Sequence, residues 1–124
     1  MTRYMMSVYG AAEYNEYGSY PTEEAMKQAM ADTDEFNQQL QKDGYWVFAD
    51  GLAPATTATV VDGQGAETVI TDGPYLEAKE FLGGYYLVDV ASRERALELA
   101  AMIPDAGIEG LGVEVRGVEF ADGL

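Results

Sequence analysis

Alternating apolar and polar positions predict β-strands near both ends of the chain and in its middle. The segment Arg3–Tyr9 alternates with a period of two, so its side chains divide between two faces, one of which carries Tyr4, Met6 and Val8. The same period recurs in Tyr85–Val90 and Val113–Phe120, and a short apolar run occupies Tyr45–Ala49. These segments are the expected strands of one sheet.

Two other stretches place apolar residues at helical spacing. The first follows Pro21 and is expected to stop at Gly44; its apolar positions are Met26, Ala29, Met30, Phe36 and Leu40, with the two methionines predicted to lie in the core. The second begins at Ser92, a predicted N-cap, and ends near Pro104. We therefore expect a helix between the first two strands and another before the last.

Two β-branched runs in the middle of the chain predict a hairpin. Thr57–Val61 and Glu67–Thr71 are separated by a turn sequence rich in Asp and Gly, and Asp72-Gly73-Pro74 then turns the chain again. Without this hairpin the order is strand, helix, strand, followed by strand, helix, strand. That order predicts an α+β, ferredoxin-like sheet with both helices on one face.

The opposite face of this sheet carries a mixture of side chains. The positions predicted to lie there are Arg3, Met5, Ser7, Tyr9, Tyr85, Leu87, Asp89, Glu114, Arg116 and Val118. Such a face is too apolar to be left in water and too polar for a dry core. We therefore predict a homodimer in which two sheets meet and enclose a cavity with some charged groups.

Composition excludes several chemistries. The chain has 124 residues, with seven Lys plus Arg against 22 Asp plus Glu and a formal charge of −15, and it contains neither His nor Cys. An imidazole base, a thiolate nucleophile, a Ser–His pair and metal sites built on imidazole or thiolate are therefore impossible. Only oxygen ligands could hold a metal in this chain, and we expect no metal site and no cofactor.

The same composition bears on partners and location. The few basic residues are scattered among carboxylates, so we expect no nucleic-acid partner. No apolar stretch approaches a membrane span, and the opening MTRYMMSVYG lacks the core of a signal peptide. The expectation is a cytoplasmic protein that forms a single domain over residues 1–124 and does not enter a membrane.

The most distinctive segment, residues 72–86, reads DGPYLEAKEFLGGYY. It resembles the DGPF group of the YCII-related superfamily: the Asp-Gly-Pro matches, Tyr75 replaces the usual Phe, and further matches fall at Glu77, Lys79, Glu80, Gly83, Gly84 and Tyr85. The resemblance extends over nearly the whole chain. It departs near the end, where Gly117 stands at the position of a proline that the group usually has.

The resemblance implies a ferredoxin-like fold assembled as a dimeric α/β barrel. The broader superfamily is similar to small-molecule enzymes such as muconolactone-type isomerases and dehalogenases, which have an Asp and a His near the site; this chain has no His to complete that pair. The group is also often encoded beside extracytoplasmic-function sigma factors. That association suggests a regulatory role with a sigma-factor partner as the alternative to catalysis.

Candidate catalytic residues lie in the motif itself. Asp72 is a candidate acid or base, although Asp-Gly-Pro is equally a sequence that forms turns. Glu80 is a second candidate acid or base, and Lys79 would stabilise a developing enolate. The alternative for this charged segment, which also contains Glu77, is an ion-paired stretch that orders the approach to the glycine pair.

Candidate binding residues are aromatic or basic. Tyr9, Trp46 and Tyr85 are predicted to line a pocket for a flat ligand, although each could instead be a packing residue. Arg116 is predicted either to bind a substrate carboxylate or to pair with Glu114 or Asp89. The leading hypothesis is a small-molecule enzyme or binding protein that uses proton-transfer chemistry without a redox cofactor; the alternative is a non-catalytic interaction module.

Overall fold

A computed structural model describes residues 2–10, 15–18, 20–76, 78, 80–104 and 112–119 of the chain. Its elements, in chain order, are β1 (Thr2–Gly10), α1 (Glu23–Lys42), β2 (Trp46–Gly51), a 3-10 turn η1 (Ala55–Thr57), β3 (Thr59–Asp62), β4 (Val69–Asp72), β5 (Phe81–Val90), α2 (Arg93–Ala101) and β6 (Val113–Gly117). The predicted order of strands, helices and hairpin is confirmed. The predicted extension of the last strand to Phe120 lies partly outside the described residues.

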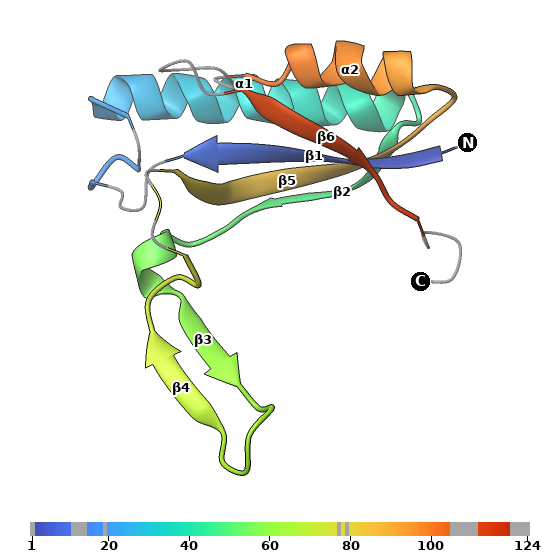
Figure 1. Cartoon of the computed structure of the whole chain (residues 1–124). Coiled ribbons are helices and arrows are strands. Elements are labelled where there is room, and N and C mark those ends of the chain that lie inside the picture. The colour runs from blue at the N-terminus through green and yellow to red at the C-terminus, as the bar shows by residue number, and fades with distance from the viewer. Residues whose placement is uncertain are drawn as a thin grey trace.

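The main sheet has four strands in the order β2-β5-β1-β6, and every neighbouring pair is antiparallel. Both helices lie on one side of this sheet (Figure 1). The arrangement is a mixed α+β fold compatible with the predicted ferredoxin-like architecture. The dimeric barrel stays a prediction, since the structure describes one chain.

Both helices begin at residues that cap the free backbone N–H groups of the first turn. The Thr22 hydroxyl accepts a hydrogen bond from the Ala25 N–H at 3.1 Å, and the Ser92 hydroxyl accepts one from the Arg95 N–H at 3.2 Å. Gly44 follows α1 with a φ of 80°, a conformation that favours glycine. The predicted N-cap at Ser92 and the predicted stop at Gly44 are confirmed.

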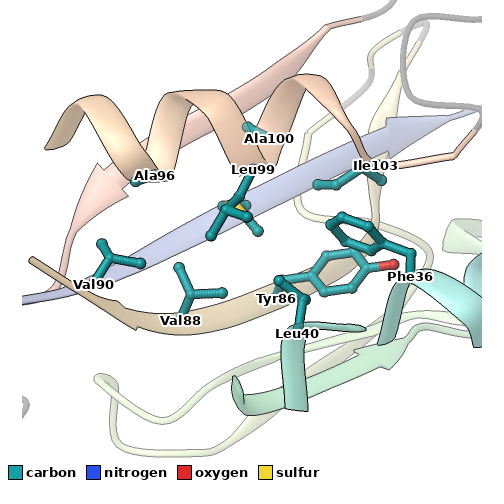
Figure 2. Close-up of a cluster of buried hydrophobic side chains, with 10 residues drawn as sticks. Phe36, Leu40, Tyr86, Val88, Val90, Ala96, Leu99, Ala100 and Ile103 are labelled. Atoms are coloured by element: carbon teal, nitrogen blue, oxygen red, sulfur yellow. The ribbon is translucent and has the colours of Figure 1, made fainter. Parts of the chain in front are cut away.

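The hydrophobic core fills the space between the helices and the sheet (Figure 2). Met6, Val88 and Val90 are completely buried, and the ring of Phe36 meets the ring of Tyr86 edge-on with centroids 5.6 Å apart. Tyr86, Val88 and Val90 alternate along β5 with the residues predicted for the opposite face, and all three pack beneath the helices. The prediction for Met30 is wrong: its side chain is 63% exposed, because it lies on a side of α1 that does not contact the sheet.

The glycine pair belongs to the sheet itself. β5 begins at Phe81 rather than at Tyr85 as predicted, and the pairing with β1 skips Gly83 between Gly84 and Leu82, which is a β-bulge. A Cβ on Gly84 would lie 3.1 Å from the backbone oxygen of Asp50, so a larger residue here would push β2 and β5 slightly apart. The glycine pair thus serves the backbone: Gly83 lies in the bulge, and Gly84 lies where β2 approaches β5.

The hairpin formed by β3 and β4 projects away from the sheet on the side remote from the helices (Figure 1). We call residues 59–72 the arm. The predicted hairpin is confirmed, with its first strand starting at Thr59 because Thr57 belongs to η1. Its apolar side chains are exposed: Val61 by 63%, Val69 by 56% and Ile70 by 67%.

Neither of the described helices has the length and apolar character needed to cross a membrane.

Candidate functional site

The side of the four-stranded sheet opposite the helices carries the mixed set of side chains predicted from the alternation. We call this side the open face. From the strand registers its residues are Arg3, Met5, Ser7, Tyr9, Phe48, Asp50, Tyr85, Leu87, Asp89, Glu114 and Arg116. It is the counterpart of the core face, whose partly buried residues Tyr4, Val8, Ala49, Val113 and Val115 pack against the buried cluster.

The registers arrange the middle of the open face in a row that crosses all four strands. Leu87 of β5 lies opposite Phe48 of β2 on one side and Met5 of β1 on the other, and Met5 lies opposite Arg116 of β6. The row is therefore apolar over three strands and ends in a guanidinium. Such a row suits a ligand with a flat apolar body and an anionic end.

A second row lies beside the first. It consists of Asp50, Tyr85, Ser7 and Glu114, in the order of the strands. Ser7 is only 4% exposed, although serines are usually found at the surface. The ring centroids of Tyr85 and Phe48 are 6.1 Å apart, so these aromatic side chains join the two rows.

Trp46 does not share a face with the other predicted binding residues. The register of β2 shifts between Trp46 and Phe48, with Trp46 opposite Val88 and Phe48 opposite Leu87. This bulge puts Trp46 against the hydrophobic core, while Phe48 faces the opposite side and is 47% exposed. Phe48 therefore lies on the face where Trp46 was predicted to lie. Regular alternation along the strand could not have revealed this exchange, because the exchange depends on the bulge.

Arg116 is exposed on the open face and forms no ion pair within the described part of the chain. The two predicted alternatives to ligand binding, pairing with Glu114 or with Asp89, are therefore not found. Glu114 is on the same strand and face, while Asp89 lies opposite Arg3 on β1 and is not in register with Arg116. Arg116 is thus available to a carboxylate from outside the chain.

Asp89 was not among the predicted site residues, yet one of its oxygens is unusual. Its Oδ1 is buried and has no hydrogen-bond partner among the described residues. A buried polar atom without a partner costs about 1–3 kcal/mol, so such atoms are rare and often belong to sites. The alternation of Tyr85–Val90 was enough to place Asp89 on the open face. The burial of its Oδ1 atom depends on the neighbouring strands.

Of the predicted catalytic residues, Asp72 and Glu80 lie within the described part of the chain, and both are exposed. Asp72 ends β4 in an exposed position, and the next residue, Gly73, has a φ of 105° and donates its N–H to the Ala58 carbonyl at 2.7 Å. The predicted turn is thus present. Glu80 is exposed directly before β5, whereas Lys79 lies outside the described residues, as does Glu77. Within those residues no group of three carboxylates could hold a metal.

Of the predicted binding residues, the structure brings Tyr9, Tyr85 and Arg116 to one face. Tyr9 lies near the end of β1 opposite Leu82, beyond the bulge, and is partly buried. A separate hollow of about 240 Å³ lies beside α1 and contains none of the predicted catalytic residues and none of Tyr9, Trp46, Tyr85 and Arg116. It is lined by Tyr20, Ala29, Met30, Thr33, Asp34 and Asn37. The open face is therefore the candidate site.

Two comparisons relate the chain to known proteins. The family described as YCII-related domain matches residues 3–121. An uncharacterised protein from Rhizobium meliloti (strain 1021) is 40% identical over 65 residues, which is 52% of this chain and 52% of that protein. The chain thus matches about half the length of this curated relative.

Proposed function

The chain belongs to the YCII-related family, and from that premise we propose that its open face binds a small molecule with a carboxylate and a flat apolar group. The observation that carries the proposal is Arg116, which is exposed and unpaired within the described part of the chain. The apolar row of Phe48, Leu87 and Met5 leads up to it.

An unpaired arginine is informative in a chain with this composition. Carboxylates outnumber basic side chains by 22 to seven, so an arginine that only needed a partner would have many to choose from. A guanidinium is planar, remains charged and can donate two parallel hydrogen bonds to one carboxylate. The aromatic pair of Phe48 and Tyr85 would hold the ring or conjugated part of the same ligand.

A second copy seated on the open face would complete the site. In one chain the apolar row is only partly covered, and Phe48 is 47% exposed. Closure by another sheet would remove water from this row and strengthen the interaction between Arg116 and a bound anion. The predicted homodimer is therefore part of the proposal, and the ligand would lie between the two sheets.

The chemistry proposed for this site is proton transfer, as in isomerisation or elimination. A carboxylate at Glu80 or Asp72 would take a proton from a carbon next to a carbonyl group, and the electrons of that C–H bond would move to the carbonyl oxygen as an enolate. Lys79, Arg116 or the Tyr85 hydroxyl would stabilise the negative charge. Nothing in this scheme needs a redox cofactor.

Binding can be tested by calorimetric titration with trans-cinnamate and with its neutral amide. We expect cinnamate to bind about tenfold more tightly than the amide, and Arg116→Ala to remove that preference. Arg93→Ala is the matched control, because Arg93 is an exposed arginine of α2 on the far side of the sheet. Equal binding of acid and amide, or an unchanged preference in Arg116→Ala, would overturn the proposed ligand class.

Proton transfer can be tested with phenylpyruvate in heavy water. Its methylene protons exchange for deuterium when a base removes them, and NMR follows the loss of signal. We expect the protein to accelerate this exchange over buffer, and Asp72→Asn or Glu80→Gln to reduce the acceleration. If both folded variants exchange at the rate of the unaltered protein, neither carboxylate is the base.

The charge of −15 favours a second candidate function, a non-catalytic module that binds a basic protein such as an extracytoplasmic-function sigma factor. Such binding should be strong at low salt and weak at high salt, because screening acts on exposed charges. A pull-down with the purified sigma factor at two salt concentrations tests it. A salt-sensitive complex formed by a chain that does not bind cinnamate would favour this candidate.

A further inference from the structure

The arm is the most exposed apolar feature in the described part of the chain. Its side chains Val61, Val69 and Ile70 are each more than half exposed, and Tyr75 and Leu76, which follow it, are 83% and 66% exposed. A two-stranded hairpin without other support is marginally stable in water. Exposed apolar patches on a projecting element are typical of surfaces that another molecule covers.

The two faces of the arm carry similar side chains in different arrangements. On one face two apolar residues lie directly opposite each other, whereas on the other face Val60 lies opposite Thr71 and Val69 lies opposite Asp62. The register pairs Val61 with Ile70 and Thr59 with Asp72, so these four side chains share one face. On this face a contiguous apolar pair, 63% and 67% exposed, lies directly beside the candidate carboxylate. Any molecule that covers Val61 and Ile70 would therefore also lie against Asp72.

We propose that this face of the arm docks on the open face of a second copy and contributes Asp72 to the site that contains Arg116 of that copy. The inference rests on the proposed function, because it uses the two-copy site described there. Its new content is that each site is composite, with the arm of one copy and the sheet of the other. Asp72, which ends β4 of the arm and is not part of the four-stranded sheet, would then act in the site of the second copy.

Position supports a second copy as the occupant. The arm projects on the side of the sheet remote from the helices (Figure 1). A second copy seated on the open face would lie on that same side, so it would meet the arm without any rearrangement of the chain. Because a two-fold axis repeats each contact, both arms would be covered at once.

Charge supports the same occupant. The docking face of the arm has an apolar pair and one carboxylate, Asp72, and the apolar row of the open face ends at Arg116, which forms no ion pair within the described residues. The neighbouring row carries Asp50 and Glu114, so the row that ends at Arg116 is the part of the open face that suits the arm. Apolar surface would thus meet this apolar row, and Asp72 would lie on the side of Arg116. A contact of this kind also reduces the repulsion between two chains of charge −15.

Single cysteines can test the docking directly, because the chain contains none of its own. One preparation carries Ile70→Cys on the arm, and a second, marked by a mass tag, carries Glu114→Cys beside Arg116. After subunit exchange and mild oxidation, any mixed disulfide must join two molecules. We expect it to form at least about tenfold faster than with the control Met30→Cys, whose residue is 63% exposed on α1.

A second measurement uses the apolar pair. Val61→Thr with Ile70→Thr preserves β-branching while making the face polar, and it should weaken the dimer about tenfold or more in sedimentation. The matched change Val69→Thr lies on the other face of the arm and should leave the dimer unchanged. Equal effects of the two changes would count against docking by the Asp72 face.

The outcomes separate this inference from the proposed function. A dimer without preference for the Ile70 and Glu114 disulfide would leave the two-copy site standing and overturn the placement of the arm. A clear preference combined with unchanged cinnamate binding in Arg116→Ala would confirm the arm and overturn the ligand class. A chain that sediments as a monomer at all concentrations tested would overturn the inference and leave the arm to a different protein.

Discussion

The two faces of the four-stranded sheet are made by the same strands and have opposite characters. Met6 is completely buried beneath the helices, whereas its neighbour Met5 points to the open face and is only partly buried. Val88 and Leu87 differ in the same way along β5. The helix-covered face is complete within one chain, while the open face and the arm leave apolar side chains in water. The core face thus stabilises the fold within one chain, while the open face keeps apolar surface uncovered.

The largest expected difference between the faces comes from these two methionines. Met6→Ala should lower the free energy of unfolding by about 2–5 kcal/mol, because it removes buried methylenes and leaves a cavity. Met5→Ala should cost about 1 kcal/mol or less in a dilute, monomeric sample, where the side chain keeps part of its hydration. Urea unfolding measures both. Equal losses at low concentration would show that the two faces are equally covered within one chain.

A second difference concerns the close approach of β2 to β5. Gly84→Ala should destabilise the protein by about 1–3 kcal/mol, because the new methyl group would lie 3.1 Å from the Asp50 oxygen. Gly10→Ala is the control, since a methyl group on Gly10 would meet no atom of the described residues within 4 Å, and it should change stability by less than about 0.5 kcal/mol. Thermal unfolding compares them. Similar melting temperatures of the two variants would mean that β2 and β5 move apart to accommodate the methyl group without a loss of stability.

A third test uses pH. Burial raises the pKa of the Tyr86 hydroxyl above its ordinary value of 10.0, because the phenolate would lose hydration. The folded state therefore favours the neutral form, and this contribution to stability is fully present below a pH of about 10 and is lost as the pH rises through the folded-state pKa.

Tyr86→Phe should remove this loss, since the ring can still pack against Phe36 but no longer ionises. Urea unfolding between neutral and alkaline pH should then show a shallower decline than in the unaltered protein. Parallel declines would mean that other groups cause the alkaline destabilisation and that the pKa of Tyr86 does not differ between the folded and unfolded states.

The smallest effect is expected on the outer side of the helices. Glu23→Gln breaks the ion pair with Lys27, whose side chains are 60% and 70% exposed at a distance of 3.3 Å. Exposed pairs of this kind contribute about 0.3–0.5 kcal/mol, and less at high salt. Chemical denaturation at two salt concentrations should detect little or no change. A large loss would show that the helix surface contributes to stability as the core face does.

Much of the fold was predictable because its signals are local. The caps at Ser92 and Gly44, the hairpin and the alternation of Arg3–Tyr9 depend on residues close in sequence, and each is confirmed. The division of Tyr85–Val90 between the two faces followed from the same period of two. These rules were enough to place Tyr9, Tyr85 and Arg116 on one face of the sheet.

The errors arose where contacts distant in sequence decide. Trp46 and Phe48 should share a face in a regular strand, but the bulge in β2 separates them, and its position depends on pairing with β5. Met30 has helical spacing typical of a core residue, yet α1 turns it away from the sheet. The buried, unpartnered oxygen of Asp89 likewise depends on its neighbours across the sheet.

The sequence by itself determined the order of the elements, their caps and turns, the two-faced character of the strands and the kinship with the YCII-related family. The tertiary structure alone decided that Phe48 rather than Trp46 faces the candidate site, that Arg116 finds no carboxylate within the described chain, and that the arm stands away from the helices. The reason is physical: local steric and hydrogen-bonding preferences act over a few residues, whereas burial and pairing depend on which distant segments meet.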